Sequence, residues 1–358
     1  MTQLRIEPYT IPAADLGPEN PLPVFRGPNP DSAVNAESSI PEEDRRYLGW
    51  RTAYRVLPYR QQDGYNRDKK PRAFQAAVLE NEILRAIFLP EVGGHLASLL
   101  HKPSGRELLE RNPVFQPANL ALRNAWVSGG IEWNTSQLGH YYLTCSPIFA
   151  ARVTGSQGEP VLRLYEWDRV KCFPWQIDFH LPPGSPFLFS RVRLVNPHDA
   201  EIPMYWWTNI AVPEKPGHRT MVPAETALHG SFEGFRLVRM PLMPFIAHAP
   251  NWQPGAMPGR RSANIFPAPE TQSTAHMSPK ILDVTYPTQL PNSGSIFFSI
   301  AEQQRRWIAS LDEAGRGLVH ASTARMRGRK MFYWGMSQGG RRWQEYRSEE
   351  HTSELQSR

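Results

Sequence analysis

The sequence predicts an all-β protein built from antiparallel sheets that pack as a large sandwich or barrel. Proline accounts for 35 of the 358 residues, and because it removes a backbone donor and clashes inside helices, long helices are excluded. Several segments alternate apolar and polar side chains with the period of two that a half-buried strand requires. Turn residues separate these short segments, which is typical of antiparallel sandwiches and barrels.

Four strands are expected in the first part of the chain, at residues 74–79, 83–89, 161–167 and 187–195. The polar sequence Glu80-Asn81-Glu82 separates the first two and indicates a tight connection. The last of the four, FLFSRVRLV, shows the alternation most clearly, because Leu188, Val192 and Leu194 share one face while two arginines occupy the other.

Four further strands are expected near the C-terminal end, at residues 297–300, 307–311, 318–322 and 330–334. The sequence DEAGRG at residues 312–317 predicts a hairpin turn between the second and third of them. Two Pro-rich stretches interrupt the pattern. Residues 1–41 are expected to run irregularly along a larger body, and residues 241–291 are expected to form a long excursion or flap.

Composition excludes several classes of function. Hydrophobic residues make up 40% of the chain, enough for a sizeable core, and the net charge of +6 is spread over a mixed surface without long runs of like charge. We therefore expect no nucleic-acid partner. No segment reaches the length of a membrane helix or a signal peptide, so we expect no membrane partner. Two cysteines are too few for a disulfide framework, which predicts reduced thiols and a cytoplasmic location.

The last twelve residues, RSEEHTSELQSR at 347–358, resemble the in-frame translation of a sequencing-adapter oligonucleotide. The alternative is an ordinary polar C-terminal tail. If the segment is adapter-derived, the chain is a fragment whose natural C-terminal strands are absent. On this interpretation residues 347–358 should lack packed contacts and regular strand pairing.

The segment richest in chemistry is WVSGGIEWNTSQLGHYYLTC at residues 126–145. Its Gly pair gives a backbone that can approach a ligand closely, and Glu132, Trp133, Asn134 and His140 follow within a short span. Saccharide sites combine aromatic faces with polar groups in this way. The alternative is a turn with a buried tryptophan and a solvated glutamate.

A second candidate segment, PMYWWTNIAVPE, covers residues 203–214. Neighbouring residues of a strand face opposite sides, so of the adjacent Trp206 and Trp207 at most one should be core while the other looks outward. Asn209 shares the face of Trp207, and Glu214 follows at a Pro-bounded turn where ligand groups often lie. The alternative is a strand buried on both sides.

Metal and cofactor motifs are missing from the sequence. The eleven histidines show no HxH or HExxH spacing, and no CxxC, phosphate-binding loop or nucleophile elbow occurs. We therefore expect no metal and no cofactor, and from spacing alone we interpret His95 and His101 as packing or surface residues.

Five segments together resemble the DUF5107 family, namely residues 80–94, 106–117, 126–140, 203–213 and 330–345. That family is often followed by tetratricopeptide repeats and is related to the galactose mutarotase-like superfamily. The resemblance implies an antiparallel β-supersandwich over residues 45–346, preceded by a Pro-rich segment at 1–44, with carbohydrate as the ligand class. Mutarotase-like proteins carry Arg after the early Gly pair, where this chain has His95, and we place His95 among the substrate-binding candidates.

The function expected from these observations is action on, or binding of, a saccharide. Glu132 and His140 are the candidate catalytic acid–base pair, since positioned imidazole and carboxylate groups transfer protons near neutral pH. A glycosidase would need two carboxylates, for which Glu132 and Glu214 are the candidates. Substrate-binding roles are expected for the remaining candidates, Trp133, Asn134, Trp207, Asn209, Glu214 and His95. The alternatives are a non-enzymatic carbohydrate-sensing module coupled to a C-terminal repeat region, and a purely structural sandwich.

Overall fold

The structure, a computed structural model, describes residues 1–25, 35–36, 38, 40–45, 56–137, 139–202, 205–231, 236–241, 285–290, 293–326, 328–336 and 352–357. In these residues strands dominate, joined by one four-residue helix, α1 (Glu42–Arg45), and two short 3-10 turns, Lys102–Ser104 and Pro287–Gln289. The prediction of an all-β, antiparallel protein is confirmed. No helix in the described residues has the length and apolar character needed to cross a membrane.

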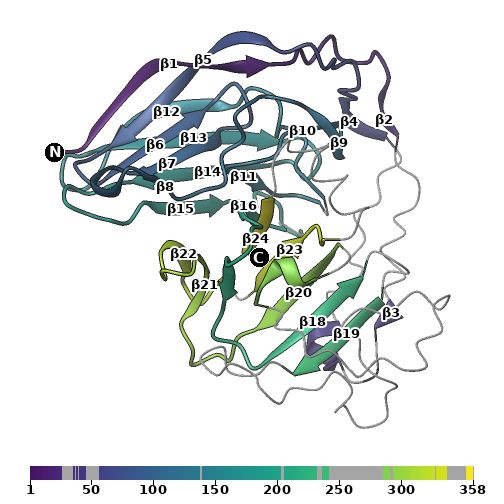
Figure 1. The fold of residues 1–358 in the computed structure, drawn as a ribbon. Coiled ribbons are helices and arrows are strands. Elements are labelled where there is room, and N and C mark those ends of the chain that lie inside the picture. Colours follow the sequence, from purple (N-terminus) through teal and green to yellow (C-terminus); the bar gives the residue numbers. More distant parts are fainter. Residues whose placement is uncertain are drawn as a thin grey trace. The chain divides into compact units, whose positions relative to one another are not determined.

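The chain divides into two compact units (Figure 1), and each is described by itself. The first unit comprises Met1–Pro30, Trp50–Val212 and Tyr346–Glu350, and the second comprises Asp31–Gly49, Pro213–Glu345 and His351–Arg358. The stretch expected to be one Pro-rich segment, residues 1–44, is therefore shared between the two units.

The main sheet of the first unit is antiparallel throughout. Its strands are, in spatial order, β1 (Gln3–Ala13), β5 (Lys70–Glu80), β6 (Leu84–Leu89), β7 (His95–His101), β11 (Ile131–Asn134) and β16 (Trp207–Pro213). The expected turn between β5 and β6 is confirmed, because Asn81 Oδ1 accepts hydrogen bonds from the backbone N–H groups of Ile83 and Leu84 at 2.8 and 2.7 Å. A buried cluster that includes Phe74, Val78 and Phe115 covers one face of this sheet.

The N-terminal residues correct one expectation. Residues 3–13, expected to run irregularly, form β1 and pair with β5 from Gln3↔Glu80 to Ala13↔Lys70. Two prolines fit within this strand because β1 stands at the edge of the described sheet, where missing N–H groups can point away from the ladder. Every second side chain of β1 is half-buried, and Tyr9 and Ile11 pack on the core. This alternation is the sequence feature that could have predicted the strand.

A second sheet packs against the first to complete a sandwich. It is four-stranded, with β12 (Phe149–Thr154), β13 (Pro160–Asp168), β14 (Phe173–His180) and β15 (Phe189–Leu194) in that order. The rings of Phe179 and Phe88 lie 4.5 Å apart and join the two sheets. In β15 the two arginines are exposed while Val192 and Leu194 are half-buried, as the alternation predicted.

Smaller elements complete the first unit. They are a two-residue strand, β8 (Arg106–Glu107), on β7, the hairpin of β9 (Ala118–Ala121) and β10 (Asn124–Trp126), and the pair β2 (Pro23–Phe25) and β4 (Val56–Arg60).

The second unit also consists of sheets. One has β17 (Arg219–Met221), β21 (Arg306–Leu311) and β22 (Gly317–Ser322), and the other has β24 (Thr352–Ser357), β23 (Arg329–Tyr333), β20 (Gly294–Ser299), β18 (Thr226–Ser231), β19 (Arg236–Pro241) and β3 (Asn35–Ala36). The strands expected near the C-terminal end are confirmed. So is the turn at 312–317, where Gly315 N–H donates to Asp312 O at 2.9 Å. Most of the expected excursion at 241–291 lies outside the described residues.

The C-terminal segment departs from its expectation. Thr352–Ser357 forms β24 and pairs with β23, from Arg329↔Ser357 to Phe332↔Glu354. The expectation that residues 347–358 lack regular strand pairing is therefore wrong for this part, while 347–351 and 358 lie outside the described residues. The adapter origin of the segment stays a prediction.

Candidate functional site

The candidate site is built on β11. Gly130, directly before this strand, lets the chain lie close to neighbouring segments. Gly130 N–H donates to Glu110 O at 2.9 Å, and Gly130 O accepts from Ala211 N–H at 2.8 Å. Its φ is +60°, and a Cβ there would lie 2.3 Å from Leu96 O and 2.6 Å from His95 Nε2. Gly130 is thus required because a side chain would clash with the protein's own backbone and a histidine ring. This finding corrects our interpretation that the Gly pair lets the backbone approach a ligand.

At the centre of the site is the carboxylate of Glu132, which is 5% exposed. Oε2 accepts from Trp126 Nε1 at 2.7 Å, and Oε1 accepts from Asn134 Nδ2 at 2.9 Å and Asn209 Nδ2 at 3.2 Å. His140 Nδ1 forms a further bond to Oε1. Four side-chain partners therefore satisfy a buried carboxylate that would be costly to leave unpaired.

The pKa values of Glu132 and of the neighbouring His95 both lie below their ordinary values. Burial works to raise the pKa of Glu132, but the charge and hydrogen bond of His140, together with the Asn134 bond, outweigh it and leave that pKa below its ordinary value. Burial lowers the pKa of His95 to about 4, against the opposing effects of the Glu132 charge and a backbone hydrogen bond with Gly129. At neutral pH the carboxylate is therefore ionised and His95 is uncharged.

His140 is the member of the cluster that reaches solvent, with its side chain 12% exposed. Because an ionised carboxylate only accepts, the Nδ1 bonded to Glu132 carries the hydrogen. The ring packs on two indoles, with its centroid 5.1 Å from those of Trp126 and Trp207. Nε2 has no hydrogen-bond partner in the part of the chain that the structure describes. The geometry presents an oriented imidazole with one nitrogen left for an external group.

The structure brings most of the predicted residues to one face of the sheet. Glu132 pairs with Asn209 and Asn134 with Trp207 across β11 and β16, so these four side chains project together, as expected. Trp126 belongs to the same cluster although we had not proposed it. It opens the quoted segment, and only the fold shows that its N–H reaches Glu132.

Trp133 is not on this face, which corrects the expectation that it lines the same surface. It lies between Glu132 and Asn134 in a strand and so faces the opposite side. Its Nε1 donates to Gly94 O at 3.0 Å, and its ring packs 5.1 Å from Phe179 between the two sheets.

The neighbouring tryptophans also differ from the expectation that one would look outward. Trp206 and Trp207 are both buried, which matches the alternative of a segment buried on both sides. Trp206 packs 6.0 Å from Trp175, while Trp207 packs on His140.

Glu214 belongs to the second unit. Its carboxylate accepts hydrogen bonds from the backbone N–H groups of Trp334 and Gly335, both at 3.1 Å, and it is buried. These bonds anchor the chain directly after β23. The paired-carboxylate hypothesis for Glu132 and Glu214 stays a prediction.

Metal-ligand geometry is not found in the described ranges, where no group of three His, Cys, Asp or Glu side chains could hold an ion. The side chains of the described site can transfer protons and form hydrogen bonds.

Fold and site together define an all-β sandwich protein with a buried carboxylate–imidazole pair. Residues 52–357 match the model of the family described as "Domain of unknown function (DUF5107)". The chain belongs to that family, which confirms the resemblance inferred from its motifs.

The solved structures that are similar to this chain include the following two. A TPR-domain containing protein from Parabacteroides distasonis ATCC 8503 aligns with a TM-score of 0.71 and 19% identity, over 99% of this chain and 50% of its own. This chain thus spans half the length of that relative, and the likeness shows a shared fold. A galactose mutarotase-like protein from Clostridium acetobutylicum aligns with a TM-score of 0.48 and 9% identity, over 79% of this chain and 84% of its own.

Proposed function

We propose that the protein binds a saccharide at the Glu132–His140 pair and that His140 Nε2 exchanges a proton with it. One observation carries this proposal. Nδ1 of His140 is held by an ionised, buried carboxylate, while Nε2 has no partner among the described residues. An acid–base group oriented in this way is the common arrangement for proton transfer by histidine.

Saccharide as the ligand class is supported by the chemistry around the imidazole and by the family resemblance. The buried rings of Trp126 and Trp207 make the surroundings of His140 apolar, and the buried Trp207 Nε1 has no partner in the described residues. Saccharides combine apolar ring faces with hydroxyl oxygens that accept such hydrogens. This combination suits a sugar better than a purely apolar or a highly charged ligand.

The reaction that one acid–base pair supports best is ring opening of an aldose. Nε2 takes the proton of the anomeric hydroxyl, the bond between C1 and the ring oxygen breaks, and water protonates the ring oxygen to give the open aldehyde. The resulting imidazolium is stabilised by Glu132 through Nδ1. On reclosure from the other face, the imidazolium returns its proton to the C1 oxygen and the attacking hydroxyl gives its proton back to the hydroxide, which completes the exchange of anomers.

Carbohydrate binding without catalysis is the second candidate, because little of the acid–base pair is open to a substrate. Glu132, Asn134, Asn209 and Trp207 are all buried, so the exposed edge of His140 is the main point of access in the described cluster.

The deciding experiment compares wild type with His140→Gln, using His101→Gln as the control because His101 stands at the far end of β7 from His95. Anomer exchange of an aldose panel is measured by magnetisation-transfer NMR, and binding by tryptophan fluorescence. For an enzyme, His140→Gln should lower the exchange rate by ~10²–10⁴-fold and His101→Gln should not. Binding without any exchange in wild type would identify the binding module, and equal rates in all three proteins would reject the proposed role of His140.

A further inference from the structure

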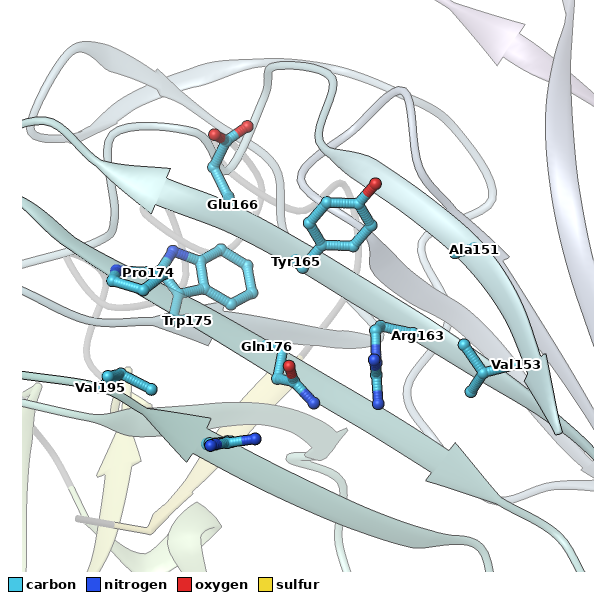
Figure 2. A pocket seen from close by; sticks show the side chains of 10 residues that line it. Ala151, Val153, Arg163, Tyr165, Glu166, Pro174, Trp175, Gln176 and Val195 are labelled. Carbon is cyan, nitrogen blue, oxygen red and sulfur yellow. The ribbon is translucent and has the colours of Figure 1, made fainter. Parts of the chain in front are cut away.

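A cavity of about 460 Å³ lies on the four-stranded sheet of the first unit (Figure 2). Its lining includes Ala151, Arg163, Tyr165, Gln176, Arg193 and Val195. The inner face of the same sheet is filled by Leu164, Ile177 and Phe179, which are fully buried. The cavity therefore belongs to the outer face, which no other described strand covers.

Strand register arranges its side chains in a row across the sheet. Phe149 pairs with Tyr165, Tyr165 with Gln176, and Gln176 with Arg193, on four successive strands. Adjacent strands are about 4.8 Å apart, so the row presents an aromatic pair, an amide and a guanidinium at regular steps. The rings of Phe149 and Tyr165 are stacked, with centroids 5.4 Å apart and planes 20° apart.

Large aromatic side chains are exposed on this face. Phe149 is 58% exposed, Tyr165 40% and Trp167 47%. Several such rings gathered on one sheet face are unusual for a surface without a ligand or partner. Flat rings beside hydrogen-bonding side chains are also suited to stacking on a sugar ring.

The charges of this face do not balance. Arg163 holds both oxygens of Asp178, with Nε to Oδ1 at 2.6 Å and the second nitrogen to Oδ2 at 2.7 Å. Arg191 and Arg193 are exposed on the same face and have no ion-pair partner in the described part of the chain. The outer face therefore has an excess of positive charge, and a free guanidinium fork matches a carboxylate.

One carboxylate lines the cavity and does not cancel this charge. Glu166 starts on the opposite side of β13 from Tyr165, and Figure 2 shows it directed away from Arg163. Its Oε1 accepts the backbone N–H of Trp167 at 2.7 Å.

We propose that this cavity, a groove on the outer face of the four-stranded sheet, is a second binding site. Its ligand is an acidic saccharide, an oligosaccharide that contains uronic acid. The carboxylate of one sugar unit binds Arg193, its hydroxyls bind Gln176, and the next ring stacks on Tyr165. The site is independent of the Glu132–His140 pair, which lies on the main sheet.

The test titrates tetragalacturonate into the full chain by calorimetry, with maltotetraose as the neutral ligand. Arg193→Gln and Tyr165→Ala should each weaken tetragalacturonate binding about tenfold, which corresponds to about 1.4 kcal/mol. Arg152→Gln is the matched control, because Arg152 is an exposed arginine on β12 whose side chain faces the other side of the sheet. Binding should weaken in 0.5 M salt, since exposed ion pairs are screened.

The outcomes separate this proposal from the one on Glu132 and His140. Tetragalacturonate binding that survives His140→Gln but is lost in Arg193→Gln supports the groove. Equal affinity for maltotetraose, or an unchanged Kd in Arg193→Gln and Tyr165→Ala, would overturn it. Tighter binding of a dT10 oligonucleotide or an oligoglutamate peptide that depends on Arg193 would also overturn it, in favour of a nucleic-acid or protein partner.

Discussion

Glu132 and Asp168 are both buried carboxylates of the first unit, yet they are held by different kinds of donor. Glu132 is bound by four side chains, three from residues 126–140 and one from β16. Asp168 Oδ1 accepts from the backbone N–H groups of Val170 and Lys171, at 3.0 and 2.6 Å, and from Ser136 Oγ at 3.0 Å.

The pKa values of the two carboxyl groups move in opposite directions. Burial raises the pKa of Asp168, and its hydrogen bonds offset only part of that effect. Glu132 is equally enclosed, but its contact with the His140 imidazole keeps its pKa low. Of these two buried carboxyl groups, the one with an imidazole partner has the lowered pKa and the one bound by a local loop cap has the raised pKa.

The largest effect is expected from the matched pair Glu132→Gln and Asp168→Asn. All four partners of Glu132 donate hydrogen bonds to its carboxylate. In Glu132→Gln the side-chain NH₂ is also a donor and would face these donors without an acceptor, so we expect the free energy of unfolding to fall by about 3 kcal/mol. In Asp168→Asn the amide oxygen can still accept from the same donors, and the loss should stay below about 1 kcal/mol. Urea unfolding of both variants measures the difference. Equal losses would show that the two carboxylates are held alike.

A smaller effect is expected from pH, through the uncharged neighbour of Glu132. The folded-state pKa of His95 is about 4 and its ordinary value is 6.5, so the unfolded chain binds more protons between these values. Stability should therefore fall by about 2.5 kcal/mol as the pH drops from 6.5 to 4, and His95→Gln should remove this part of the slope. Urea midpoints of wild type, His95→Gln and the control His101→Gln between pH 4 and 7 provide the measurement. If wild type and His95→Gln have parallel profiles, His95 is not buried uncharged.

The smallest effect is expected at the cap of Asp168. Ser136→Ala removes one donor and leaves both backbone N–H groups, so the free energy of unfolding should fall by about 1 kcal/mol. Ser156→Ala, on an exposed loop, is the control and should have no effect. A loss of several kcal/mol in Ser136→Ala would mean that Asp168 depends on side chains as Glu132 does.

Much of the fold was predictable because apolar and polar residues alternate in strands that have one half-exposed face, as in β13 and β15. The strand β1 was missed because eight prolines and the lack of a clear period in residues 1–41 indicate an irregular chain, whereas an edge strand accepts Pro8 and Pro12. Pairings between β11 and β16 join residues far apart in sequence, and no local pattern contains that register.

The sequence predicted which residues form the candidate site better than it predicted how their side chains are arranged. Glu132, Asn134 and His140 stood close in sequence and do meet. Trp133 was placed wrongly because the rule that neighbours on a strand face opposite sides was not applied to it. The outer groove was missed, since its row of side chains forms only when four strands align.

The pairing of β1 with β5 has a consequence for synthesis. Gln3 pairs with Glu80, so at about 5–20 residues per second the first strand is made roughly 4–15 s before its partner is complete. During that interval its backbone donors and acceptors are open to any other extended chain. Pro8 and Pro12 have no N–H to donate to such a chain. The prolines that made this strand hard to predict from the sequence therefore also protect the nascent protein from pairing with another extended chain.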